Sequence, residues 1–244
     1  MQNWVIVVAG GSGSRMGSET PKQFLYLLGK PIILHTLEKF IEFDDSINIV
    51  VVLPKGEESR FQKIVAEHQF NHPISIVQGG ATRFHSVKNG LEKLENQGIV
   101  GIHDSVRPLV SVNTLKETYS KAKTLGNAIP VISPNDSMRW VDSKSNRSID
   151  RGSLRIIQTP QCFKADLIKE AFNTEYQEAF TDDASVFEHA GYQINLVDGN
   201  RENIKITYPE DLIVCRAVYE NFKTFAPAIP LLDVVDYLDN SFLV

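Results

Sequence analysis

The sequence predicts an α/β fold in which a mainly parallel sheet is covered by helices on both faces. Short apolar runs rich in β-branched residues, at 5–8, 47–53, 74–77 and 99–103, end at glycine, proline or polar residues, as buried strands do. Segments with apolar residues at helical spacing lie between these runs, and strands that alternate with helices form a parallel sheet. Ligands of such sheets bind beyond the carboxyl ends of the strands, so we expect the functional residues there.

The first half of the chain repeats strand, loop and helix. Pro31 favours the start of a helix, because its fixed φ angle suits the first helical turn. Pro54 ends the β-branched run before it, and a polar segment with spaced apolar residues follows as a surface helix. After the first strand the expected elements are a helix at 31–41, a strand at 47–53, a helix at 56–67, a strand at 74–77, a helix at 83–94 and a strand at 99–103.

The second half departs from this alternation. The polar segment at 132–152 has no helical periodicity and contains a turn cluster at 143–146, so it predicts an exposed β-arm with strands near 137–142 and 147–151. A lone hairpin is only marginally stable in water, and we therefore expect the arm to pack against a second subunit; a surface loop is the alternative. The remaining expected elements are strands at 154–158 and 193–197 and helices at 165–172, 182–190 and 209–222.

Length and composition indicate a single domain of residues 1–225 and an extension at 226–244, in which a short amphipathic helix is expected. The formal net charge of −5 argues against a nucleic-acid partner held by bulk electrostatics. No run of about twenty apolar residues exists, and the first residues lack the features of a secretory signal. Cys162 and Cys215 lie far apart and form no metal-spaced cluster. These features predict a soluble, cytoplasmic protein without a membrane partner.

The loop after the first strand carries the strongest functional signal. Residues 9–22 read A-G-G-S-G-S-R-M-G-S-E-T-P-K. Glycine-rich loops expose backbone N–H groups that bind anions, and Arg15 and Lys22 add two cations, so the loop suits several phosphates at once. Met16 stands where G-x-G-x-x-G needs its third glycine, and no glycine pair fits G-x-x-x-x-G-K-[ST], so neither of the two commonest nucleotide loops is the best interpretation. A plain glycine-rich turn with two solvated cations is the alternative.

A-G-G-S-G-S-R-M-G followed by P-K-Q-F resembles the signature of the nucleotidyltransferases that attach a nucleoside monophosphate to a sugar or polyol phosphate. The P-K-Q-F form is similar to that of the cytidylyltransferases. The resemblance covers about residues 4–220. It implies a Rossmann-like fold, CTP as one substrate, a polyol phosphate as the other, Mg²⁺ bound with the triphosphate, and a homodimer formed through the β-arm.

Two cytidylyltransferase families share these motifs: the methylerythritol phosphate enzymes of isoprenoid synthesis and the ribitol phosphate enzymes of wall polymers. The short interval from Gly17 to Pro21, the pair Asp150-Arg151, and the segments T-D-D-A-S and E-N-I-K-I-T resemble the first family more closely. A hypothesis of another class is a nucleotide-binding regulatory protein that has lost catalysis. The cations and the carboxylate named below are all present, which argues against that loss.

The resemblance assigns CTP binding to residues of three loops. The second motif, G-G-A-T-R-F-H-S at 79–86, follows a strand and would contact the base, with Ser86 on the base or its sugar; a surface serine is the alternative. Asp104 follows the strand at 99–103 and suits a ribose hydroxyl or the Mg²⁺ of the triphosphate; a local ion pair with Arg107 is the alternative. The full set is Ala9, Gly10, Gly11, Ser12, Gly13, Gly80, Ser86 and Asp104, with Asp104 also as the metal ligand.

The resemblance assigns binding of the polyol phosphate to Asp104, Arg107, Ser137, Arg151, Thr159, Thr181 and Lys205. Arg151 and Lys205 resemble the two cations that position the attacking phosphate, although N-I-K-I-T also fits an ordinary strand with a solvated lysine. A phosphate nucleophile is ionised at neutral pH and needs no general base. Catalysis is therefore expected from positioning and charge neutralisation by Arg15, Lys22, Arg151 and Lys205.

Overall fold

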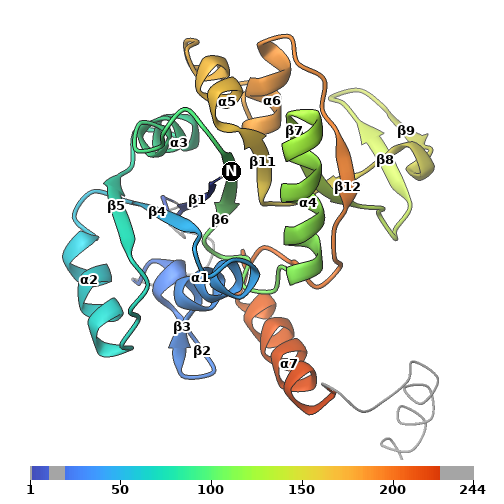
Figure 1. Cartoon of the computed structure of the whole chain (residues 1–244). Coiled ribbons are helices and arrows are strands. Elements are labelled where there is room, and N and C mark those ends of the chain that lie inside the picture. The colour runs from blue at the N-terminus through green and yellow to red at the C-terminus, as the bar shows by residue number, and fades with distance from the viewer. Residues whose placement is uncertain (1, 11–19, 226–244) are drawn as a thin grey trace, which may run out of the picture.

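The computed structural model describes residues 2–10 and 20–225. Within them, eight strands form one sheet in the order β10-β7-β11-β6-β1-β4-β5, and β12 pairs with β7 (Figure 1). Four neighbouring strands, β6, β1, β4 and β5, are parallel, whereas β11 runs antiparallel between β6 and β7. The strands are β1 (Asn3–Val8), β4 (Asn48–Leu53), β5 (Ile74–Gln78), β6 (Ile99–Asp104), β7 (Asn127–Ile132), β10 (Ile156–Ile157), β11 (Gln161–Lys164) and β12 (Leu196–Asp198). The predicted fold class is confirmed.

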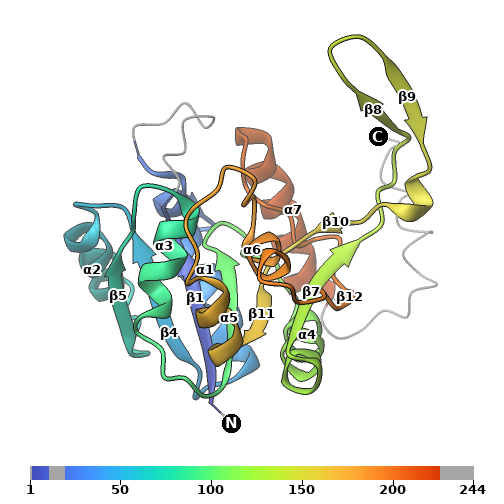
Figure 2. The ribbon, with the colours of Figure 1, turned by 90° about the horizontal axis from the view of Figure 1, so that it is seen from above.

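Helices cover both faces of the sheet (Figures 1 and 2). The helices α1 (Ile32–Phe43), α2 (Glu58–Glu67) and α4 (Val112–Leu125) pack on the face that carries Val5 and Val7 of β1. The helices α3 (Arg83–Leu91), α5 (Ala165–Ala171) and α6 (Asp183–His189) pack on the opposite face, which carries Ile6. Alternate residues of β1 thus enter two separate cores, which explains why the strand is an unbroken apolar run.

A third, smaller core joins the remaining elements. The helix α7 (Pro209–Phe225) buries Cys215 against the hairpin of β2 (Tyr26–Leu27) and β3 (Lys30–Pro31) and against the turn after β6. Pro31 is the last residue of β3 and has an extended backbone (φ −58°, ψ 140°), so α1 begins one residue later than predicted, at Ile32. No described helix is long and apolar enough to span a membrane.

The helix α4 and the strands β7 and β11 are not among the elements expected from the sequence. The ends of α4 nevertheless carry recognisable signals: the Ser111 hydroxyl accepts the N–H of Thr114 at 3.0 Å, and Gly126 ends the helix at φ +94°. The expected strand at 193–197 is displaced to β12, because the Asn127 side chain bonds the Gln193 carbonyl and the Asn195 N–H, both at 2.8 Å, in place of a ladder. The expected strand at 154–158 shortens to β10.

The predicted β-arm is present. The strands β8 (Met138–Val141) and β9 (Asn146–Ile149) form an antiparallel hairpin that projects from the sheet (Figure 2). Two large apolar side chains, Met138 and Trp140, lie on one face of this hairpin and are 40% and 43% exposed. The arm therefore presents an apolar surface that the described part of one chain does not cover. The extension at 226–244 and its expected helix lie outside the described residues.

Candidate active site

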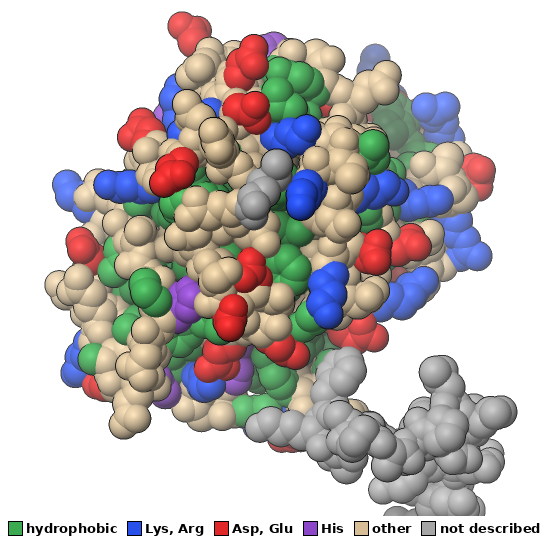
Figure 3. Space-filling view, viewed as in Figure 1, with side chains coloured by type: hydrophobic (Ala, Val, Ile, Leu, Met, Phe, Trp, Pro, Cys, Tyr) green, Lys and Arg blue, Asp and Glu red, His purple; other side chains and the backbone are tan. Residues whose placement is uncertain are grey.

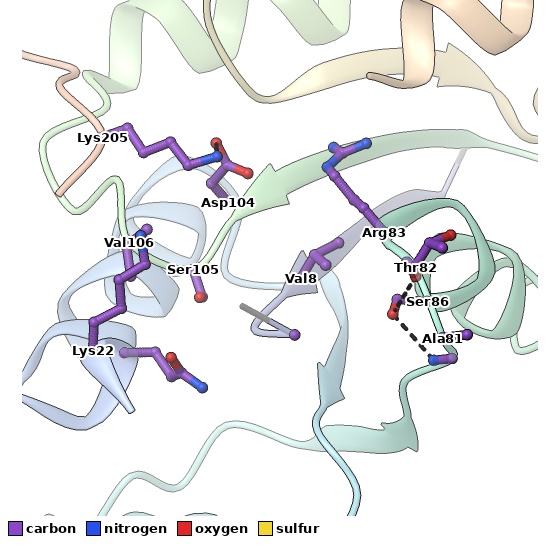
Figure 4. Close-up of a pocket in the computed structure, with 13 residues that line it drawn as sticks. Val8, Lys22, Ala81, Thr82, Arg83, Ser86, Asp104, Ser105, Val106 and Lys205 are labelled. Carbon is purple, nitrogen blue, oxygen red and sulfur yellow. Dashed lines mark hydrogen bonds and ion pairs between the residues drawn. The ribbon is translucent and has the colours of Figure 1, made fainter. Parts of the chain in front are cut away.

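A cavity of about 310 Å³ opens where β1 and β6 end and α3 begins (Figure 4). Its position agrees with the expectation that ligands bind beyond the carboxyl ends of the parallel strands. The cavity is lined by Val8, Gly10, Lys22, Gln23, Gly80, Ala81, Thr82, Arg83, Ser86, Asp104, Ser105, Val106 and Lys205. Six of the predicted site residues, Gly10, Lys22, Gly80, Ser86, Asp104 and Lys205, are thus brought together from five segments of the chain.

The two ends of the glycine-rich loop are held by backbone and side-chain bonds. The Ala9 N–H donates to the Val52 carbonyl at 2.9 Å, and Gln23 Nε2 donates to the Ala9 carbonyl at 2.8 Å. Lys22 begins the short helix η2 (Lys22–Phe24), is 8% exposed, and its Nζ donates to the Ile206 carbonyl at 2.9 Å. The Lys22 ammonium is therefore fixed at the cavity wall. Gly11, Ser12, Gly13 and Arg15 lie outside the described residues.

The second glycine motif is shaped by Ser86. The Ser86 hydroxyl accepts the Gly80 N–H at 3.1 Å and donates to the Thr82 carbonyl at 3.0 Å, while Thr82 caps the start of α3. A Cβ atom at Gly80 would lie 2.4 Å from Cβ of His85, so only glycine fits this path. Ser86 is 3% exposed, which contradicts the alternative of a surface serine. Its contact with a base stays a prediction.

Arg83 lines the cavity and is missing from the predicted site. Its guanidinium donates to both carboxylate oxygens of Asp183, at 2.8 and 2.5 Å, and Asp183 is fully buried. The pair joins the first turn of α3 to the first turn of α6, 100 positions further along the chain. Arg83 and Asp183 both belong to motifs that the sequence analysis identified, G-G-A-T-R and T-D-D-A. No local pattern predicts that these two residues form a pair.

Asp104 is the centre of the charged groups in the cavity. Its Oδ2 lies 3.0 Å from Nε of Arg107 and 3.2 Å from Nζ of Lys205. Burial alone would raise the pKa of Asp104, but Lys205, Arg107 and Arg83 outweigh this effect and hold that pKa well below its usual range. The carboxylate is therefore ionised at neutral pH. The local ion pair with Arg107, the alternative to a functional Asp104, exists but does not close the cavity to Asp104.

Arg107 and Thr159 point into the protein. Arg107 donates to Asp104 and, at 2.7 Å, to the Asn203 carbonyl, and it does not line the cavity. Thr159 is 6% exposed; its hydroxyl accepts the Asp104 N–H at 3.2 Å and contacts Nδ1 of His103 at 3.0 Å. The structure thus gives both side chains partners inside the fold. Their contact with a polyol phosphate stays a prediction.

Three other predicted residues lie outside the cavity. Ser137 and Arg151 are exposed at the base of the arm, where η3 (Arg151–Ser153) follows β9 and the Arg151 guanidinium bonds the Asn135 carbonyl. Thr181 is exposed beside Asp182, which caps α6. The space-filling view shows Lys and Arg side chains gathered on the side of the molecule that carries the arm (Figure 3). None of the three lines the cavity that holds Lys205.

Residues 203–205 form no strand, so the interpretation of N-I-K-I-T as an ordinary strand is wrong. Asn203 is fully buried, and its Nδ2 donates to the Thr159 carbonyl at 2.9 Å. This bond fixes the loop that carries Lys205. Among the described residues, no group of three or more histidine, cysteine or acidic side chains has the arrangement of a metal site.

Glycine-rich loops and cations at the carboxyl ends of parallel strands define the class to which the molecule belongs. It is an α/β protein built to hold the phosphates of a nucleotide. Comparison with known proteins narrows this class. A family model described as "IspD: 2-C-methyl-D-erythritol 4-phosphate cytidylyltransferase" matches residues 4–221. The chain belongs to this cytidylyltransferase family, as its motifs predict.

Relatives and solved structures agree with this assignment. The chain is 44% identical over 218 residues, 89% of its length, to the whole 2-C-methyl-D-erythritol 4-phosphate cytidylyltransferase of Phocaeicola vulgatus. It is 46% identical over 213 residues to that of Bacteroides fragilis, covering 87% of this chain and 97% of the relative. The crystal structure of the Thermus thermophilus enzyme of the same name superposes with a TM-score of 0.72 at 29% identity, over 90% of this chain and all of that one.

Proposed function

We propose that the protein transfers the cytidylyl group of CTP to 2-C-methyl-D-erythritol 4-phosphate, releasing pyrophosphate and forming the cytidine diphosphate derivative used in isoprenoid precursor synthesis. The family assignment supports this activity. The observation that carries it is the convergence of Lys22, Asp104 and Lys205 on one cavity beside both glycine motifs. These residues come from loops far apart in the sequence, and two lysines at one cavity suit a site that holds a triphosphate together with a second phosphate substrate.

The chemistry follows from the charges. An oxygen of the acceptor phosphate, already ionised, forms a bond to the α-phosphorus of CTP, and the bond from that phosphorus to the bridging oxygen breaks as pyrophosphate leaves with the electron pair. The barrier comes from bringing two anions together while charge grows on the leaving group. Lys22, with Arg15, neutralises the transition state and the leaving group. Lys205 holds the attacking phosphate in line.

A divalent cation fits the carboxylate of Asp104. Both ion pairs of Asp104 use Oδ2, and Oδ1 makes no hydrogen bond to the described residues, although Asp104 lines the cavity. Mg²⁺ binds oxygen ligands and in nucleotide sites takes one or two carboxylates together with phosphate oxygens. We propose that Asp104 Oδ1 holds Mg²⁺ with the triphosphate; when bound, the ion neutralises phosphate charge.

We also propose a homodimer formed through the arm. The exposed Met138 and Trp140 lie on one face of the arm and give it an apolar surface for a second copy. Such a copy could bring Ser137 and Arg151 of one protomer to the acceptor side of its neighbour's cavity. Analytical ultracentrifugation of Trp140→Ser tests the dimer, with the monomer as the expected product. The two cysteines are free and buried, which supports a reducing cytoplasm as the location of the protein.

The test of the activity is pyrophosphate release from CTP and Mg²⁺, with methylerythritol phosphate and ribitol phosphate in parallel reactions. Release with methylerythritol phosphate alone, abolished in Lys22→Ala, is the expected result. Release with ribitol phosphate alone would refute the proposed acceptor. Binding of CTP without turnover of either acceptor would favour the nucleotide-binding regulatory protein.

A further inference from the structure

We propose that His103 is a positioning residue for cytidylyl transfer: it locks together the loops that hold Asp104 and Lys205 at the cavity. The inference rests on the proposed function. His103 is fully buried at the end of β6 and does not line the cavity, so any effect on the reaction passes through other residues. The sequence carries no functional signal at His103, because a residue at the end of the predicted strand at 99–103 needs no function to account for it.

The contacts of the imidazole define one protonation state. Its Nε2 lies 3.2 Å from the Arg107 carbonyl, and its Nδ1 lies 3.0 Å from the Thr159 hydroxyl. A carbonyl only accepts, so Nε2 carries the proton and Nδ1 accepts from the Thr159 hydroxyl. The hydroxyl oxygen remains free to accept the Asp104 N–H at 3.2 Å. Every donor in this series of hydrogen bonds meets an acceptor. A charged imidazole would donate from both nitrogens and leave the Thr159 hydroxyl proton without an acceptor in the series.

These bonds close a ring around Asp104. His103 ties the Arg107 backbone to Thr159, Thr159 holds the Asp104 backbone, and the Arg107 side chain returns to the Asp104 carboxylate at 3.0 Å. Asp104 is thereby fixed through both its backbone and its carboxylate. In Figure 4 this carboxylate lies beside the Lys205 ammonium at the cavity wall.

The ring extends to the loop of Lys205 through Asn203. The Asn203 carbonyl accepts from Arg107 at 2.7 Å, and its Nδ2 donates to the Thr159 carbonyl at 2.9 Å. Lys205 follows two residues later and reaches Asp104 at 3.2 Å. Loss of the imidazole bonds would loosen Thr159 and Arg107 together. The positions of the Asp104 carboxylate and the Lys205 ammonium both depend on these two residues. A displacement of about 1 Å in a positioned group is enough to slow a transfer reaction on the order of a hundred-fold.

The experiment compares His103→Phe, which keeps the ring and removes both bonds, with Phe40→Leu. Phe40 packs edge-on against the His103 ring at 5.0 Å, so this control disturbs the same core without touching the hydrogen bonds. At saturating CTP and acceptor we expect kcat to fall ten-fold or more in His103→Phe, on the order of the loss from a misplaced group. The Kd for CTP should change less than kcat, because Thr82 and Ser86 anchor the second glycine motif separately. Phe40→Leu should keep kcat near that of the wild type.

Thr159 provides a second pair of variants. Thr159→Val removes the hydroxyl and should lower kcat by about as much as His103→Phe does. The double variant that combines both substitutions should lose no more than either single variant. Thr159→Ser keeps the hydroxyl and should recover most of the activity. If His103→Phe does not fold, this pair alone decides the inference. A kcat in His103→Phe equal to that in Phe40→Leu, or equal losses in Thr159→Val and Thr159→Ser, would overturn it.

A readout without turnover separates this inference from the proposed function. Acetylation of Lys205 by acetic anhydride, mapped by mass spectrometry, reports its contact with Asp104, because an amine held 3.2 Å from a carboxylate is less accessible to the reagent. We expect faster labelling of Lys205 in His103→Phe and unchanged labelling in Phe40→Leu. If the wild type has no transferase activity but the labelling follows this pattern, the proposed function fails and the locking role of His103 stands. Equal labelling in both variants would refute that role.

Discussion

Gly80→Ala tests the claim that the backbone of the second glycine motif approaches α3 too closely for any side chain. The new Cβ would lie 2.4 Å from Cβ of His85 and 3.1 Å from its backbone carbon. Carbon atoms in contact are separated by about 3.5–4.0 Å, so one of the two segments must move by about 1 Å. His85 belongs to the first turn of α3 and cannot yield alone. Overpacking of this kind costs about 1–3 kcal/mol of the free energy of unfolding.

The same displacement breaks the bond from the Gly80 N–H to Ser86 and shifts the cavity wall. The affinity for CTP should therefore fall by about ten-fold, equivalent to one further lost interaction of about 1.4 kcal/mol. Urea unfolding followed by circular dichroism measures the first effect, and calorimetric titration with CTP the second. Gly10→Ala is the matched control for stability, because its Cβ would meet only Ser86 Oγ at an ordinary 3.5 Å. If Gly80→Ala matches this control in stability and binds CTP as the wild type does, the close approach is not required.

Three further predictions concern charge and burial. Lys205→Ala should lower kcat about a hundred-fold in the pyrophosphate-release assay, and Lys205→Arg less, because the arginine keeps the charge. Burial lowers the pKa of His103 to about 4, below the 6.5 of the unfolded chain, so unfolding at a pH between these values takes up a proton. The free energy of unfolding should therefore be unaffected by His103 above pH 6.5 and fall by about 2 kcal/mol by pH 5, as measured by urea titrations. Burial also raises the pKa of Cys215 to about 12 and that of Cys162 well above its usual value, so a thiol reagent at pH 8 should label both only after unfolding.

A different result would refute each of these three predictions. Equal activity in Lys205→Ala and the wild type would remove Lys205 from the reaction. His103→Gln should lose the acid-dependent slope of stability between pH 6.5 and 5, and a slope that persists would assign it to other groups. Rapid labelling of Cys215 in the native state would mean that α7 separates from the hairpin of β2 and β3.

The order of residues along the chain was enough to predict which loops form the cavity. Parallel strands end at one edge of a sheet, so the loops after β1, β5 and β6 had to lie together. Gly10, the second glycine motif and Asp104 accordingly line one cavity. The hairpin of the arm followed equally from its alternating pattern and turn cluster. In contrast, α4, with a serine and a glycine at its ends, was missed although its boundary signals are local.

What a side chain does once its loop is placed depends on contacts between distant segments. Arg83 meets Asp183 100 positions away, and Lys22 reaches the Ile206 carbonyl 184 positions away. No local pattern encodes such pairs, since an arginine after a glycine motif suits solvent as well as a buried carboxylate. The same limit applies to Thr159, because its bonds to His103 and to the Asp104 backbone join segments more than fifty positions apart.

The sequence by itself determined the fold class, the family and the edge of the sheet where the cavity lies, because periodicity and loop composition are properties of short segments. Only the tertiary structure decided which charges are buried, which are paired and which line the cavity. Burial makes an unpaired charge or donor costly, so each polar group takes whatever partner the packing supplies. For Asp104 those partners are Arg107, Thr159 and Lys205, and they set its charge and its direction.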